Sequence, residues 1–144
     1  MQLDNLYQEV ILDHYKHPEH KGLSATSDVQ VHHINSSCGD ELTLNLSLID
    51  GTIVVSWDGI GCSISMASAS MMSGLLSGKT LAEAGPILEV FVSLMQSKGT
   101  QTGDESVLED AVAFAGVSKY PARIKCALLG WMAFKDAAVQ VQGK

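Results

Sequence analysis

Four residues of this chain could together form a site for a metal ion. The three cysteines are Cys38, Cys62 and Cys126, and Asp40 lies two residues after the first of them. Three thiolates and one carboxylate make four ligands, a set that suits tetrahedral zinc and also an iron–sulfur cluster. The long gaps between these residues match no short zinc-finger pattern, so spacing alone does not show that the side chains meet.

Burial is the competing interpretation of the cysteines, because free cysteines are among the residues most often found in protein cores. Three cysteines cannot all pair within one chain, and a cytosolic setting would keep them reduced. Cys38 and Asp40, however, lie in the polar segment NSSCGDEL, where Gly39 lets the backbone turn. A cysteine that only fills space is out of place there, so the local context favours metal binding.

Composition limits the class of protein to which the chain could belong. With 144 residues, 46% of them hydrophobic and 17% charged, it should fold as a single domain over 1–144. A net charge of −7, with nine scattered Lys and Arg residues, argues against binding to nucleic acid or anionic lipid. The N-terminal segment MQLDNLYQEV is polar and acidic, and no apolar run reaches the length of a membrane span. We therefore expect a cytoplasmic protein without a membrane segment.

Hydrophobic periodicity predicts an α+β fold: an N-terminal helix, a three-stranded antiparallel sheet, and a C-terminal helical layer packed on it. Strands are expected for VQVHHIN, LTLNLSLI and TIVVSWDGI, with Asp50-Gly51 as the hairpin turn between the last two. The segment 97–104 should be a loop. Helices are expected at 2–17, 63–78, 80–96, 106–116 and 121–141, the third of them with a capping box formed by Thr80 and Glu83.

These elements place the four candidate ligands near element ends. Cys38 and Asp40 fall in the connection between the first two strands, and Cys126 falls one turn inside the last helix. Cys62 lies at or just before a helix start, where the helix dipole favours a thiolate. Such ends can converge at one edge of a small α+β domain.

The five histidines are weaker candidates for a site. His14, His17 and His20 cluster near the end of the first helix, and we expect them on the surface. His32 and His33 are neighbours on a strand, so their side chains should point to opposite faces of the sheet. Joint binding of one ion by that pair is therefore not expected.

Several motifs in order give the chain a specific resemblance. The segments LYQEVILDHYKHPEHKG, SCGDEL, GIGCSISMASASMM and RIKCALLGW resemble SufU members of the NifU/IscU-like scaffold family of iron–sulfur cluster assembly proteins. The resemblance implies an IscU/NifU-like fold in which Cys38, Asp40, Cys62 and Cys126 bind zinc or a cluster. Lys125 stands where the IscU branch has histidine, which leaves Asp40 as the fourth ligand, and about 97–118 resembles the insertion that marks SufU.

The resemblance also implies a function. A SufU-type zinc site would accept persulfide sulfur at Cys38 from a PLP-dependent cysteine desulfurase of the SufS type and pass it on for cluster biogenesis. The chain would then be at most a zinc-dependent sulfurtransferase. The alternative is a scaffold on which a [2Fe-2S] cluster is assembled and transferred to apo-proteins.

Arg123 is a candidate supporting residue, since it precedes Cys126 by three positions and so shares its helix face. We expect it to stabilise the thiolate-rich site or to receive the sulfur-bearing loop of the partner. The alternative is a solvated surface arginine.

Overall fold

The computed structural model describes residues 5–143, in which an N-terminal helix, a three-stranded sheet and further helices follow one another as predicted. The N-terminal helix is described from Asn5 onward, and its predicted start at residue 2 lies outside the described residues. The elements are α1 (Asn5–Lys16), β1 (Val29–Asn35), β2 (Asp40–Ile49), β3 (Thr52–Ile60), α2 (Ser63–Leu76), α3 (Leu81–Gln96), α4 (Glu105–Leu108), the 3-10 helix η1 (Glu109–Lys119) and α5 (Pro121–Gln142).

The sheet is the predicted antiparallel meander, in the order β1-β2-β3. Asp50 and Gly51 join β2 to β3 with φ angles of 53° and 80°, the paired positive values of a type I′ turn. β1 pairs with β2 from Val29↔Leu46 to Asn35↔Asp40. This register fixes which residues of neighbouring strands face the same side.

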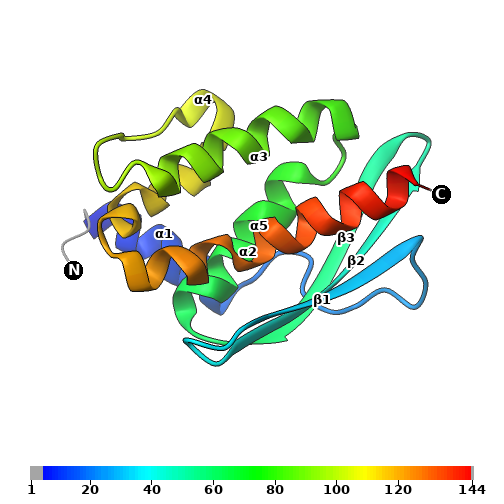
Figure 1. Cartoon of the computed structure of the whole chain (residues 1–144), viewed down its shortest axis with the longest axis horizontal. Helices are drawn as coiled ribbons and strands as arrows, with labels where there is room; N and C mark the ends of the chain where they lie inside the picture. The colour runs from blue at the N-terminus through cyan, green and yellow to red at the C-terminus, as the bar shows by residue number, and fades with distance from the viewer. Residues whose placement is uncertain (1–4, 144) are drawn as a thin grey trace.

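One face of the sheet is covered by helices. Leu42, Leu44 and Leu46 alternate along β2 and are fully buried, as is Trp57 on β3. In Figure 1, α5 runs across this face, with α2 beside it and α3 farther from the sheet. The C-terminal helical layer is therefore packed on the sheet as predicted. Among the helices of residues 5–143, none is long and apolar enough to span a membrane.

The segment that follows α3 differs from the single short helix predicted at 106–116. A loop at 97–104 leads to one turn of α-helix, α4, and then to η1. The break falls at Glu109, whose φ of 49° cannot continue a right-handed helix. Asp104 caps α4 by accepting a hydrogen bond from the backbone N–H of Ser106. In α3, by contrast, the predicted capping box of Thr80 and Glu83 is present.

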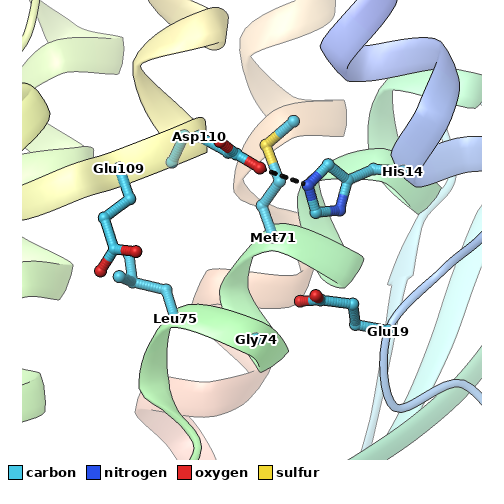
Figure 2. A pocket seen from close by; sticks show the side chains of 8 residues that line it. His14, Glu19, Met71, Gly74, Leu75, Glu109 and Asp110 are labelled. Carbon is cyan, nitrogen blue, oxygen red and sulfur yellow. Dashed lines mark hydrogen bonds and ion pairs between the residues drawn. The ribbon is translucent and has the colours of Figure 1, made fainter.

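His14 is buried, so its predicted surface position was wrong. Its side chain points from α1 toward η1 in Figure 2, with Nε2 3.0 Å from Asp110 Oδ2. Its Nδ1 lies 2.8 Å from Ser70 Oγ on α2, and that oxygen also accepts the backbone N–H of Glu19. Because the Asp110 carboxylate can only accept, Nε2–H donates to it, and Nδ1 of the neutral ring then accepts the Ser70 hydroxyl. His17 is exposed, as predicted.

Replacing His14 should destabilise the fold. His14→Ala leaves the buried Ser70 hydroxyl without its acceptor and unties α1 from η1, so the free energy of unfolding should fall by about 2 kcal/mol. Urea titration followed by circular dichroism measures the change. The exposed His17→Ala is the matched control and should stay within about 0.5 kcal/mol of wild type. Equal stabilities of the two variants would contradict the structural role given to His14.

Candidate metal centre

Strand alternation carries Asp40 into the interior. It is the first residue of β2 and belongs to the same inward row as Leu42 and Leu44, so its carboxyl group is fully buried beneath α5. Asn35 is its partner in the β1–β2 register and therefore faces the same side. The apolar row of the strand thus ends in a carboxylate at one edge of the sheet.

Glycine at position 61 leaves room for that carboxylate. A Cβ atom there would lie 2.4 Å from Asp40 Oδ1 and 2.7 Å from Ser65 Oγ, which is closer than real Cβ contacts. Gly39 meets a second requirement, because its φ of 70° is a backbone conformation that other residues rarely adopt. Gly39 thus allows the turn that carries Cys38. Gly61 allows the chain just after β3 to approach Asp40 closely.

Three of the four predicted ligands come together at this edge. Each of Cys38, Asp40 and Cys126 offers one ligand atom, and these three atoms lie within 4.8 Å of one another. The two sulfur atoms are 2.9 Å apart, and both cysteines are free thiols. Cys126 lies in the second turn of α5 and is fully buried, whereas Cys38 is half-buried in the β1–β2 turn.

Cys62 lies beside this group without belonging to it. It is the N-cap residue of α2, as predicted, and its backbone N–H donates to Asp40 Oδ1 at 2.9 Å. Its Sγ is 4.0 Å from Asp40 Oδ2 and 3.6 Å from Ser65 Oγ. The four predicted ligands therefore share one neighbourhood, with Asp40 in contact with the residues on both sides.

The electrostatics of this neighbourhood suit a cation. Within the described part of the chain, no Lys or Arg forms a salt bridge with the buried carboxyl group of Asp40, although buried charges in proteins are usually paired or bound to metal. Burial raises the pKa of the Cys126 thiol well above its usual value, and Cys38, Cys62 and Asp40 add to the rise. A bound metal ion would supply the missing positive charge beside Asp40. It would also lower the pKa of the Cys126 thiol, because it favours thiolate over thiol. The donor set and its surroundings thus fit a metal ion.

Arg123 and Lys125 both precede Cys126 on α5, and both are exposed. No side-chain hydrogen bond or ion pair of Arg123 with a ligand residue is found between positions 5 and 143. Its supporting role therefore stays a prediction.

Two polar side chains near the sulfur atoms were missed by the sequence interpretation. Asn35 Nδ2 lies 3.7 Å from Cys126 Sγ, and Ser65 Oγ lies 3.6 Å from Cys62 Sγ. The alternation of β1 from Val29 already directs Asn35 inward, and Ser65 follows Cys62 by three residues, the spacing of helix neighbours. Those signals give a direction for each side chain, while the contact with sulfur depends on the packing of α5 and α2.

This combination of fold and site defines a class of protein. The model of the NifU-like N terminal domain matches residues 6–127, and the chain belongs to that family. It is 46% identical to the zinc-dependent sulfurtransferase SufU of Bacillus subtilis over 98% of this chain and 95% of that protein. It is also 38% identical to the iron–sulfur cluster assembly scaffold protein IscU of Streptococcus pyogenes, over 94% of this chain and 84% of that one.

Solved structures agree with this membership. A crystal structure from Fervidobacterium islandicum, described as an iron–sulfur cluster assembly scaffold protein for the SUF system, superposes with a TM-score of 0.82 at 34% identity. The superposition covers 90% of this chain and 94% of the chain from Fervidobacterium islandicum. The N-terminal part of a NifU-like protein from Brucella abortus superposes with a TM-score of 0.81 at 26% identity, over 98% and 97% of the two chains. The predicted IscU/NifU-like fold is thereby confirmed.

A side chain at position 61 should disturb the candidate metal centre. In Gly61→Ala the new methyl group meets the Asp40 carboxylate, which must move out of line with Cys38 and Cys126, so zinc affinity should fall by roughly tenfold to a hundredfold. Competition with a chromogenic chelator measures that affinity.

Gly85→Ala in α3 is the matched control, because a Cβ there has no neighbour within 4 Å. It should leave zinc affinity unchanged, because α3 carries none of the candidate ligands. Equal zinc affinities of Gly61→Ala and Gly85→Ala would contradict the close approach of Asp40.

Proposed function

We propose that this chain is an iron–sulfur cluster assembly protein that binds zinc through Cys38, Asp40, Cys62 and Cys126. In this proposal Cys38 accepts persulfide sulfur from a PLP-dependent cysteine desulfurase of the SufS type and passes it on for cluster biogenesis. The observation that carries the proposal is the meeting of Cys38, Cys126 and a fully buried Asp40 at one point. Similarity to a relative named a zinc-dependent sulfurtransferase supports zinc as the metal.

The transfer step needs one reactive thiolate. Zinc, when bound, would hold the cysteine ligands as thiolates at neutral pH. The Cys38 thiolate attacks the outer sulfur of the partner's cysteine persulfide, the sulfur–sulfur bond of the partner breaks, and the partner's cysteine leaves as a thiolate. Cys38 then carries the persulfide, and no net oxidation or reduction occurs.

Cys38 is the ligand best placed for that role. It lies in a turn next to Gly39 and is half-buried, whereas Cys62 and Cys126 are fixed at the starts of α2 and α5. A turn can move a ligand away from the metal and toward a partner at lower cost than a packed helix can. The Cys38 side chain is therefore the one that meets the incoming persulfide.

Loss of the Cys38 thiol should abolish sulfur acceptance. With its cognate desulfurase and cysteine as substrate, the Cys38→Ala variant should give no stimulation of sulfide release above the desulfurase alone. Mass spectrometry of the wild-type chain should find the added sulfur on Cys38. Ser37→Ala, an exposed neighbour in the same turn, is the matched control and should keep full stimulation. Undiminished stimulation by Cys38→Ala would overturn the proposed transfer.

The scaffold function is the second candidate, because relatives at 38% and 34% identity are named cluster assembly scaffold proteins. Metal analysis after purification with and without air separates the two. One equivalent of zinc together with loss of stimulation in Cys38→Ala supports sulfur transfer. Labile iron and sulfide that pass to an apo-ferredoxin support the scaffold, and binding of neither metal would overturn the site itself.

Arg123 is proposed to receive the partner at the mouth of the site. Its charged side chain is exposed one helical turn before Cys126, where it could attract an anionic persulfide or an acidic partner surface. Arg123→Ala should raise the desulfurase concentration needed for half-maximal sulfur transfer several-fold. It should leave zinc affinity unchanged. Lys125→Ala, which removes an exposed cation from the same helix, should have a smaller effect. Equal effects of the two variants would reduce the role of Arg123 to general surface charge.

A further inference from the structure

The three ligand cysteines differ in their hydrogen-bond donors. Asn35 Nδ2 lies 3.7 Å from Cys126 Sγ, and Ser65 Oγ lies 3.6 Å from Cys62 Sγ. Within residues 5–143, Cys38 Sγ has no comparable N–H or O–H donor from a side chain. Its hydrogen-bond contacts are the Cys126 thiol, which donates to it at 2.9 Å, and the backbone oxygen of Ala122 at 3.9 Å, which can only accept.

Asn35 is held in place to serve Cys126. It is the last residue of β1, pairs with Asp40 across the sheet, and faces α5. Its backbone oxygen accepts the N–H of Cys38, which ties it to the turn that carries the first ligand. An amide nitrogen can only donate, so Nδ2 stabilises Cys126 as a thiolate, the form that accepts hydrogen bonds and binds metal.

Ser65 can change its partner with the state of Cys62. Its hydroxyl group is fully buried in the first turn of α2 and donates to the backbone oxygen of Cys62 at 3.1 Å. That oxygen also accepts the backbone N–H of Met66, so it keeps a partner when the hydroxyl turns away. When Cys62 is a thiolate, the Ser65 hydroxyl can donate to its sulfur without leaving a buried group unsatisfied.

A hydrogen bond to a thiolate draws charge from the sulfur and makes it a weaker nucleophile. We infer that Asn35 and Ser65 are positioning residues that keep Cys126 and Cys62 as unreactive ligands and leave Cys38 as the thiolate that reacts. The inference rests on the metal-bound thiolates of the proposed function. It adds the reason why one of three chemically equal ligands accepts sulfur.

Low solvent accessibility could by itself explain a low reactivity of Cys126, but not of Cys62. Cys126 is fully buried, so a partner could not reach it with or without Asn35. Cys62 and Cys38 are both half-buried, so exposure does not separate them. Ser65 therefore provides the decisive test of reactivity, and Asn35 is tested by a spectroscopic signal that does not depend on access.

The first experiment measures the reactivity of each cysteine. The zinc-loaded full-length chain is treated with limiting iodoacetamide, and mass spectrometry gives the fraction of each cysteine that is alkylated. Wild type should react first at Cys38. In Ser65→Ala, the alkylation of Cys62 relative to Cys38 should rise about fivefold to tenfold. Ser73→Ala is the matched control, because Ser73 is another fully buried α2 serine whose hydroxyl donates to the carbonyl three residues earlier.

The second experiment replaces zinc with cobalt(II) and records the thiolate-to-cobalt charge-transfer band. Loss of a hydrogen bond raises the energy of the sulfur lone pairs, so the band should move to lower energy in Asn35→Ala and in Ser65→Ala. Asn45→Ala is the control for Asn35, since Asn45 is a buried sheet residue whose amide donates to Ser24. That control should leave the band where wild type has it.

The outcomes separate this inference from the proposed function. If wild type binds one equivalent of cobalt and both the band and the alkylation ratio are unchanged in the two variants, the inference is overturned and the metal site stands. If wild type binds neither zinc nor cobalt, the inference and the metal site fall together. If Asn35→Ala loses cobalt binding while it unfolds at the same urea concentration as Asn45→Ala, the positioning role is supported.

Discussion

The burial of the Asp40 carboxylate is the constraint around which this site is arranged. A charged group in the interior is costly unless donors or a cation surround it. The backbone N–H of Cys62 supplies one donor, and the missing side chain of Gly61 supplies the space. The thiols of Cys38 and Cys126 lie on another side of the carboxylate, where a metal ion would offset its charge.

Strand register transmits that constraint to the rest of the fold. Because side chains alternate along a strand, a slip of one residue in β2 would turn Asp40 to solvent together with the leucines of the core. The same register sets Asn35 opposite Asp40, and the packing of α5 on this face brings Cys126 to both. Formation of the core and assembly of the candidate site are therefore one event, since the same inward row serves both.

The mixture of fixed and movable candidate ligands suits the sulfur transfer proposed for this site. Helices α2 and α5 hold Cys62 and Cys126, and the N-terminal end of α2 favours negative charge on the sulfur of Cys62, its N-cap residue. The turn between β1 and β2 holds Cys38 and depends on the positive φ of Gly39. In that proposal the helices keep the metal in place while the turn presents the Cys38 sulfur to a partner.

The sequence by itself determined most of the elements and the residue types of the candidate site. Alternating and helical periods predicted the three strands and most helices, and the motifs around Cys38, Cys62 and Cys126 predicted which side chains would share a site. Local rules suffice for the strands and helices, because periodicity, turn glycines and caps act over a few residues.

Only the tertiary structure decided what depends on distant partners. His14 is buried because Ser70 and Asp110, far along the chain, satisfy both of its ring nitrogens. The helix expected after the 97–104 loop breaks at Glu109, where α4 gives way to η1. The nearness of Asn35 to the Cys126 sulfur likewise follows from the packing of α5 on the sheet. Hydrogen bonds between remote segments leave no periodic trace in a sequence, so only the packed chain reveals them.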